Sequence, residues 1–303
     1  DSTFSGAYKW IGVDNHHFLA ALIPPTGTIP EVRVEADRKI APSARVVVNA
    51  TLKPGEKLDR DFLVFVGPKK MDLLDAADHD LRASVNFGTF GVIAQVLLRI
   101  LRVFDHITGN WGWAIVMLTL LIQLVMYPLT KRSLLHSVKM KELQPHLKKL
   151  QEQYKDDPKR YQIEMMNFYR KNGMKFMGLE GCFPMLLQLP IFYAFYATLN
   201  VAYDLRGAAW IFWIQDLASK DPHYILPILM GAGMFLQQKT SGMAADPAQA
   251  RMMMFMPAMF TFMFLQMPAG LVLYWWINSL TTMGIQKVLS WKMKNQPTII
   301  APA

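Results

Sequence analysis

Four long stretches of the chain contain no Asp, Glu, Lys or Arg. They cover residues 110–130, 181–203, 222–238 and 252–286. A helix needs about 20 apolar residues to cross the hydrocarbon core of a bilayer, so the first three stretches each predict one transmembrane helix. The fourth is too long for one helix, and Met267-Pro268-Ala269-Gly270 near its middle predicts a tight turn. The pattern therefore predicts five transmembrane helices.

The Lys and Arg residues between and after these stretches predict the orientation. Seventeen of them lie in residues 131–180, 239–251 and 287–303, whereas only Arg206 and Lys220 lie between the second and third stretches. Lys and Arg accumulate in the cytoplasmic loops of membrane proteins. We therefore expect the C-terminus in the cytoplasm and the start of the chain on the opposite side.

The first 86 residues differ from the rest in charge and in pattern. They carry a net charge of −1, against +10 for residues 87–303. Short apolar runs in residues 31–36, 44–52 and 62–67, with a Pro54-Gly55 turn, predict antiparallel strands. We expect residues 1–86 to be the C-terminal part of a β domain whose earlier strands are missing from this chain.

Residues 87–109 predict an amphipathic helix. Phe90, Ile93, Leu97, Ile100 (or Leu101) and Phe104 recur every three or four positions, and polar side chains occupy the other face. We favour a helix that lies in the membrane surface with its apolar side down. The alternative is an ordinary helix that caps the β domain.

Residues 131–180 predict a basic helical hairpin. Leu134, Leu143 and Leu147 form an apolar edge, and Asp156-Asp157-Pro158 predicts the turn between two helices. The candidate docking residues are Lys131, Arg132, Lys139, Lys141, Lys148 and Lys149. Two interpretations remain open: a surface that docks anionic lipid, the ribosome or a nascent chain, and a solvated loop whose charge only sets the orientation.

The sequence contains no motif for catalysis or for cofactor binding. It has no Walker A loop, no H-E-x-x-H, no G-x-S-x-G and no dinucleotide fingerprint. The single cysteine, Cys182, excludes an intrachain disulfide and a Cys-cluster metal site. The charge-free helices also argue against an ion-coupled transporter. We expect no enzymatic activity, no metal or cofactor, and no direct nucleic-acid substrate.

Neutral polar residues share faces in three of the predicted helices. Thr119, Gln123 and Tyr127 are spaced i, i+4, i+8 in the first helix, and Tyr274, Asn278 and Thr282 have the same spacing in the last. Gln188 marks a polar side of the second helix. Each face alone fits hydrogen bonding between helices. Together they favour a water-containing cavity.

A methionine stripe gives the fourth predicted helix an apolar face. Met252, Met256, Met259, Met263 and Met267 follow helical spacing. Methionine is flexible and polarizable, and suits surfaces that accept variable apolar partners. Plain packing between helices is the alternative interpretation.

Six sequence blocks, in this order, resemble the YidC-type membrane protein insertases. They are Gly109-Asn110-Trp111-Gly112, Met126-Tyr127-Pro128-Leu129-Thr130-Lys131, Gly181-Cys182-Phe183-Pro184, Gln188-Leu189-Pro190-Ile191-Phe192, residues 224–231 and residues 270–274. The resemblance covers residues 85–292. It implies an α-helical membrane protein with a five-helix insertase core (110–130 and 181–292), a cytoplasmic helical hairpin (131–180), an interfacial helix (87–109), a cytoplasmic tail (293–303) and the end of a periplasmic β-sandwich (1–86). It also implies an anchor helix and the rest of the sandwich before this chain.

The resemblance implies a function and partners as well. Such insertases place nascent inner-membrane proteins in the bilayer, alone or with the Sec translocon, through a hydrophilic groove open to the cytoplasm and to lipid. The implied location is the bacterial inner membrane, with a periplasmic N-terminal domain and a cytoplasmic C-terminus. The implied partners are nascent membrane proteins, the Sec translocon and its accessory subunits, the ribosome through the basic segments, and the phospholipid bilayer.

The resemblance also selects site residues. The groove candidates are Gln123, Thr119, Tyr127, Tyr274, Trp275, Asn278, Thr282 and Gln188, and the candidates for a hydrophobic slide are Met252, Met256, Met259, Met263, Phe192 and Phe195. Where the family has an arginine, this chain has Gln123. A neutral amide does not attract carboxylates as a guanidinium does, so we expect a weaker preference for acidic substrate flanks.

Two other classes of function remain as alternatives. A small-solute channel or lipid flippase needs a path open at both faces, or paired repeats around a midplane site, and the sequence shows no repeat. A static scaffold for the assembly of membrane complexes needs stable partners and no insertion activity.

Overall fold

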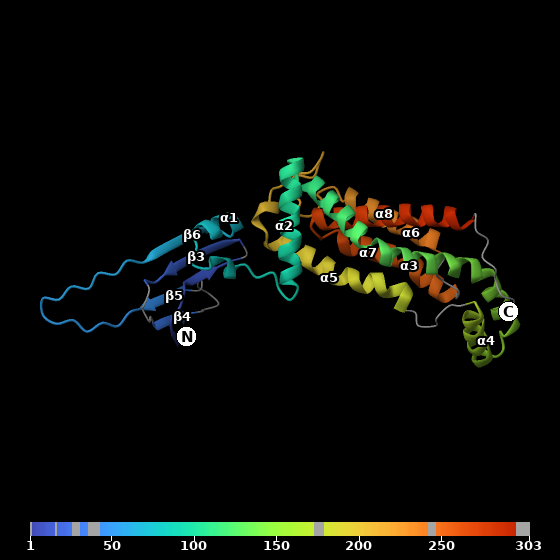
Figure 1. Ribbon diagram of the computed structural model, residues 1–303, viewed down its shortest axis with the longest axis horizontal. Helices are drawn as coiled ribbons and strands as arrows, with labels where there is room; N and C mark the ends of the chain where they lie inside the picture. Colours follow the sequence, from blue (N-terminus) through green and yellow to red (C-terminus); the bar gives the residue numbers. More distant parts are fainter. Residues whose placement is uncertain are drawn as a thin grey trace. The chain divides into compact units, whose positions relative to one another are not determined.

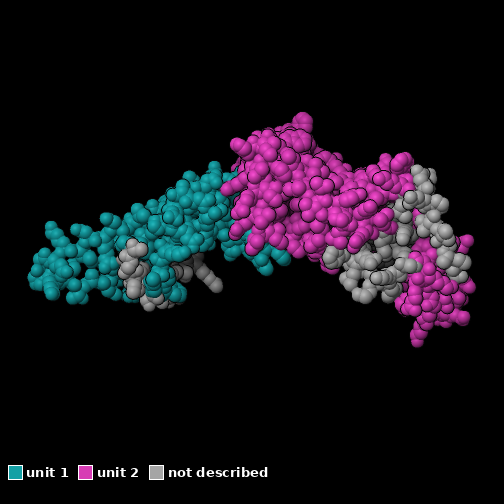
Figure 2. Space-filling model, viewed as in Figure 1, with its two compact units in different colours: residues 1–91, 200–204 teal, residues 92–199, 205–303 magenta. Residues whose placement is uncertain are grey.

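The computed structural model describes residues 2–15, 17–25, 31–35, 43–172, 179–241 and 247–294. The chain forms two compact units, one of residues 1–91 with 200–204 and one of residues 92–199 with 205–303 (Figure 2). Most of the described residues are helical.

The first unit contains two three-stranded antiparallel sheets. One has the order β1-β4-β5 and the other β2-β3-β6 (Figure 1). The strands are β1 (Ser2–Ser5), β2 (Ile11–Asp14), β3 (Phe18–Ile23), β4 (Glu31–Glu35), β5 (Ser43–Val47) and β6 (Leu63–Pro68). A short helix, α1 (Met71–Ala76), and a 3₁₀ turn, η1 (Leu81–Ser84), follow β6.

The sheet boundaries refine the strands expected from sequence. The second expected strand, residues 44–52, ends at Val47, because Val47 pairs with Glu31 and the partner strand β4 begins there. In the other sheet, Leu19, Ala21 and Ile23 of β3 are buried in alternation, which is the pattern of a strand with one covered face. At the end of β6, the buried Lys69 ammonium pairs with Asp14 and donates to the Ser84 carbonyl oxygen at 3.1 Å.

The second unit consists of helices. They are α2 (Gly91–Thr108), α3 (Trp111–Gln153), α4 (Pro158–Lys171), α5 (Leu179–Val201), α6 (Ile225–Ser241), α7 (Pro247–Phe264) and α8 (Ala269–Lys294), with a 3₁₀ turn η2 (Tyr203–Leu205) after α5. Helix α8 packs against α3 and α6, and α6 also packs against α7 (Figure 1). Helix α2 buries Ala94, Leu97, Leu98 and Leu101, and the Thr198 hydroxyl of α5 donates to the Ala94 carbonyl oxygen.

Helix α3 is longer than the sequence indicated. The expected boundary at residue 130 is absent, and one helix of 43 residues runs through Pro128 and Pro145. A proline removes one backbone hydrogen bond and often bends a helix, but it need not end one when good helix formers flank it. The Asn110 side chain caps the helix by accepting from the amides of Gly112 (2.9 Å) and Trp113 (3.2 Å).

The expected hairpin turn is confirmed between α3 and α4. Pro158 is the first residue of α4, and the Asp157 side chain caps it by accepting from the Arg160 amide at 3.1 Å. The two helices pack through a small apolar cluster of Leu143, Leu147 and Phe168. Apolar packing therefore closes the hairpin.

The expected turn near residues 267–270 separates α7 from α8. The amides of Ala269 and Gly270 donate to the carbonyl oxygens of Ser219 (2.7 Å) and Leu217 (2.9 Å), so the α5–α6 loop caps the start of α8. A Cβ on Gly270 would lie 3.1 Å from Ile115 and 3.0 Å from Leu199. Glycine permits this close approach of three helices.

Within the described residues, one helical segment is long and apolar enough to cross a bilayer. It is Trp111–Leu135. Two apolar helical segments, Leu186–Val201 and Met254–Phe264, are shorter.

Candidate functional site

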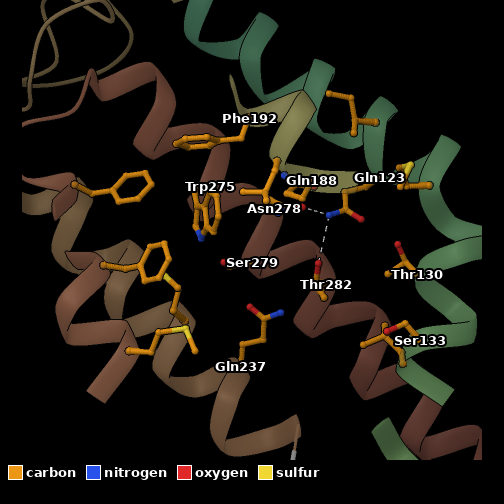
Figure 3. A pocket seen from close by; sticks show the side chains of 18 of the residues that line it. Gln123, Thr130, Ser133, Gln188, Phe192, Gln237, Trp275, Asn278, Ser279 and Thr282 are labelled. Carbon is orange, nitrogen blue, oxygen red and sulfur yellow. Dashed lines mark hydrogen bonds between the residues drawn. The ribbon is translucent and has the colours of Figure 1, made fainter. Parts of the chain in front are cut away.

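A cavity of about 550 Å³ lies among α3, α5, α6, α7 and α8 (Figure 3). None of the described residues that line it is Asp, Glu, Lys, Arg or His. The lining residues are Ile122, Gln123, Met126, Thr130, Ser133, Leu134, Gln188, Leu189, Phe192, Met234, Gln237, Met256, Phe260, Met263, Phe264, Trp275, Asn278, Ser279 and Thr282. The wall is therefore uncharged, with a polar part and an apolar part.

The polar part is built around Gln123. This residue of α3 is 8% exposed, and its amide donates to the side-chain oxygens of Asn278 and Thr282 on α8, the latter at 3.3 Å (Figure 3). Asn278 and Thr282 are one helical turn apart and share a face. The bonds therefore tie the two helices together at the cavity wall.

A second polar contact joins α5 to α8. The Gln188 amide lines the cavity and donates to the hydroxyl of Tyr274. The Tyr274 side chain is buried behind this contact, and its ring lies 5.1 Å from that of Phe195. Tyr274 thus holds Gln188 in place and does not itself line the cavity.

The apolar part of the wall is aromatic and sulfur-rich. The Trp275 ring lies 5.4 Å from Phe192, 5.5 Å from Phe264 and 6.0 Å from Phe260, measured between ring centres. Edge-to-face and offset contacts at these distances stabilise aromatic clusters. Met256 and Met263 of α7 extend this wall.

Five of the eight groove candidates line the cavity, namely Gln123, Gln188, Trp275, Asn278 and Thr282. Thr119 is fully buried outside it, with its hydroxyl donating to the Ile115 carbonyl oxygen at 2.7 Å, and Tyr127 is exposed outside it. Steps of four residues rotate by about 40° around a helix. Thr119 and Tyr127 therefore lie on either side of the face that Gln123 presents.

The slide candidates also divide between wall and surface. Met256, Met263 and Phe192 line the cavity, whereas Met252 and Met259 are exposed on α7 and Phe195 is buried under Tyr274. Of the docking candidates, Lys131, Arg132, Lys148 and Lys149 are exposed on α3. The side chains of Lys139 and Lys141 lie outside the described ones.

Sequence reasoning missed several polar lining residues. Ser133 continues the cavity face of α3 beyond the expected helix end. Gln237 of α6 and Ser279 of α8 complete the polar lining. A continuous α3 would have indicated Ser133, but no periodic signal marks Gln237.

The described residues contain no group of three or more His, Cys, Asp or Glu that could hold a metal ion. The site's chemistry is therefore that of amide and hydroxyl groups beside an aromatic wall. Such a wall can hydrate a polar chain and contact an apolar one.

Comparison with known proteins agrees with this architecture. Residues 103–296 match the family model described as 60Kd inner membrane protein, and residues 1–100 match that of the YidC periplasmic domain. A solved structure titled "Active YidC insertase crystal structure with the first transmembrane domain resolved" aligns with a TM-score of 0.57 at 22% identity, over 94% of this chain and 65% of that one. The two chains share a fold.

Curated relatives named "Membrane protein insertase YidC" are similar over most of this chain. The protein from Endomicrobium trichonymphae is 41% identical over 284 residues, which are 91% of this chain and 54% of that protein. The protein from Nitrosococcus oceani is 41% identical over 280 residues, 91% of this chain and 51% of that protein. This chain spans about half the length of these relatives. By sequence and by fold, it belongs to the YidC family.

Proposed function

We propose that this protein inserts nascent proteins into the bacterial inner membrane and helps them fold there. The observation that carries the proposal is the uncharged cavity, which joins amide and hydroxyl groups on one wall to aromatic rings and methionines on the other. The names of the relatives, membrane protein insertase, support the same conclusion.

The proposed topology has five transmembrane helices. They are the first part of α3 and helices α5, α6, α7 and α8. The excess of Lys and Arg in residues 131–180, 239–251 and 287–303 supports a cytoplasmic position for those residues. Helices α6 and α7 have 17 and 18 residues, near the minimum for a span, which favours a locally thinned bilayer. The hairpin of α3 and α4 then lies in the cytoplasm, and the first unit is the end of a periplasmic β-sandwich.

The mechanism follows from the cost of moving a polar flank through lipid. A charged side chain at the bilayer centre costs about 2.5–3.5 kcal/mol on insertion scales. Gln123, Asn278 and Thr282 offer hydrogen-bond partners along part of this path. The distance that the flank must cross without such partners therefore becomes shorter. The apolar segment of the substrate contacts Met256, Met263 and Phe192 and then leaves for the lipid, which drives the step.

Gln123 makes the proposed groove neutral. The resemblance places an arginine at this position in the family, and this chain has an amide that both donates and accepts. The cavity lining among the described residues has no cation to attract an acidic flank. We therefore expect the efficiency of insertion to depend less on the charge of the substrate's flank, at equal flank length, than it does with an arginine-bearing relative.

The proposed partners meet the protein on its cytoplasmic side. Lys131, Arg132, Lys148 and Lys149 are exposed on α3 and offer positive charge to ribosomal RNA, a nascent chain or anionic lipid. Cooperation with the Sec translocon and its accessory subunits is part of the proposal by family membership.

Reconstituted insertion tests the proposal. The purified protein in liposomes, supplied with single-span substrates during their synthesis, should protect the translocated flank from added protease. A matched variant is Gln123→Leu with Asn278→Leu, which removes two amides from the polar wall, and its control is Thr119→Val outside the cavity. A leak of small solutes or a transfer of lipid without substrate would instead support a channel or flippase. Stable partners without insertion would support a scaffold.

A further inference from the structure

The loop between α5 and α6 carries an aromatic tip, Trp210-Ile211-Phe212-Trp213, in which Phe212 is exposed and the other three side chains are half-buried. Phe212 is 81% exposed, the highest value among the exposed large hydrophobic residues in the described part of the chain. Its ring stacks on Trp213 with centres 6.0 Å apart and planes at 17°. The exposed Phe212 ring thus lies on the half-buried Trp213 ring at the tip.

The tip is fixed to the start of α3. The Asn110 side-chain amide donates to the carbonyl oxygens of Ala209 (3.2 Å) and Trp210 (3.3 Å). A Cβ on Gly112 would lie 2.0 Å from the Trp210 ring, so the indole packs directly on the backbone of α3. Within the loop, the Trp210 amide donates to the Ile214 carbonyl oxygen at 3.0 Å. The tip is therefore held in one position.

The backbone conformation at Phe212 is one that favours glycine or asparagine over phenylalanine. Its φ is +52°, in the left-handed region where glycine and asparagine are usual and a bulky side chain adds strain. Strained conformations persist where the surroundings hold them, and they gather at functional positions. A bulky, exposed ring at such a position points to a role for the ring itself.

The tip lies at the end of an exposed apolar stripe on α3. Trp113, Leu120 and Leu124 are spaced i, i+7, i+11, and all three are exposed. This stripe faces the lipid if α3 crosses the bilayer. Trp113 meets Trp210 edge to face with ring centres 5.9 Å apart, so the loop continues the stripe at the level where the apolar segment begins. Tryptophan is enriched at this level of membrane proteins.

The charges of the loop also suit a lipid surface. Arg206 and Lys220 flank it and are both exposed. Two of the three Asp residues in the loop accept hydrogen bonds from its own backbone or from the start of α6: Asp216 from the Gly207 and Ala218 amides, and Asp221 from the His223 and Leu226 amides. Positive side chains beside an aromatic tip match phosphate headgroups above acyl chains.

We infer that Phe212 and Trp213 insert into the headgroup boundary of the outer leaflet, and that the partner of this surface is the bilayer itself. The tip then fixes the depth of α3 in the membrane, and with it the depth of the cavity wall that Gln123 provides. The inference rests on the proposed membrane position of α3 and not on insertase activity.

Hydroxyl-radical footprinting of the full chain in nanodiscs with one copy each tests the inference. Phe212 should oxidise several-fold more slowly than Phe4, an aromatic residue of the first unit that is 52% exposed. If Phe212 reacts as fast as Phe4 or faster, the tip lies in water and the inference is wrong.

A second measurement identifies lipid as the cover. In a Cys182→Ser background, a fluorophore on Phe212→Cys should be quenched by lipids with a nitroxide near the headgroup, and one on Ser219→Cys in the same loop much less. Leu124→Cys should be quenched by a nitroxide deep in the acyl chains. Quenching at Leu124 but not at Phe212 overturns the inference alone, whereas quenching at neither overturns the membrane position of α3 as well.

The contribution of the ring is tested without disturbing the turn. Phe212→Gly suits the left-handed backbone, so the loop should keep its fold. In this variant, the fluorophore on Leu124→Cys should report a different depth in the quenching profile. Phe212→Leu should keep the profile of the parent protein. An unchanged profile in Phe212→Gly would show that the ring does not set the depth of α3.

Discussion

The side-chain amide of Gln123 on α3 donates to the side-chain oxygen of Asn278 on α8, across the wall of the cavity. Each residue gives the other a partner in a region that the proposed topology places inside the membrane. A polar group without a partner is costly there. The bond therefore both holds two helices together and keeps hydrogen-bonding groups at the cavity wall.

The two roles of this bond can be separated by a double-mutant cycle. Gln123→Leu or Asn278→Leu alone leaves a buried polar group with fewer partners, and such pairs are worth about 0.6 kcal/mol on average in membrane proteins. We expect each single variant to lower the free energy of unfolding and the double variant to recover part of it. Insertion of a substrate with a polar flank should fall in all three and be lowest in the double variant, as measured by protease protection.

The control for this cycle is Thr119→Val, a buried position on the same helix but outside the cavity. It should leave insertion unchanged. If the double variant regains insertion together with stability, the bond has only a structural role.

The charge preference of the groove should change with one substitution. Two unit charges about 4 Å apart interact by about 1 kcal/mol in water and about 4 kcal/mol near a protein surface. Gln123→Arg should therefore raise the ratio of insertion for an Asp-flanked over a Lys-flanked substrate by a factor of about five or more. In the parent protein we expect a ratio near one. A strong preference for acidic flanks in the parent protein would contradict the neutral groove.

How much of this site the sequence could predict depends on helix geometry. The i, i+4 spacing placed Asn278 and Thr282 on one face of α8, and the structure joins both to Gln123. The same spacing suggested Thr119 and Tyr127, which rotate away from the cavity because four residues exceed one helical turn.

Other parts of the structure depend on contacts between distant segments. The first charge-free stretch ends at residue 130, yet α3 continues to Gln153, and this brings Ser133 to the cavity. Gln237 is the first of five consecutive polar residues at the end of α6, and nothing in this run distinguishes it from its neighbours. Only the packing of α6 against α8 gives it a place in the site.

The contact of α6 with α7 should be sensitive to one methyl group. A Cβ on Gly231 would lie 1.9 Å from the Thr261 hydroxyl oxygen. Added volume in a packed interface costs about 1–3 kcal/mol, so Gly231→Ala should lower the thermal stability and widen the helix pair. The double variant Gly231→Ala with Thr261→Ala removes the clashing oxygen and should restore most of the stability. No rescue would show that these two helices are not in contact there.

The exposed lysines of the hairpin should provide electrostatic docking. Lys148→Gln with Lys149→Gln removes two positive charges from the exposed face of α3. We expect weaker cosedimentation with ribosomes, most clearly at low salt, because salt screens exposed charges. The matched control is Lys53→Gln with Lys57→Gln, an equal charge change on exposed residues of the first unit. Equal effects of both pairs would contradict a docking site on the hairpin.

Tyr169 links the packing of the hairpin to pH. Burial against the apolar cluster of Leu143, Leu147 and Phe168 raises the pKa of its phenol above the ordinary value of 10.0, and the nearby Tyr161 adds to the shift. Because the folded hairpin favours the neutral phenol, this group's contribution to stability is complete below about pH 10. The contribution is lost as the pH rises toward the higher folded value.

An ultraviolet titration of tyrosinate measures this shift directly. The titration curve of the parent protein minus that of Tyr169→Phe should have its midpoint above pH 10. Tyr169→Phe should also lose less stability at alkaline pH than the parent protein. Phe168→Ala opens the cluster that buries the ring, so in that background the midpoint should move back toward 10.0. A midpoint that Phe168→Ala leaves unchanged would mean that α4 does not pack on α3 through this cluster.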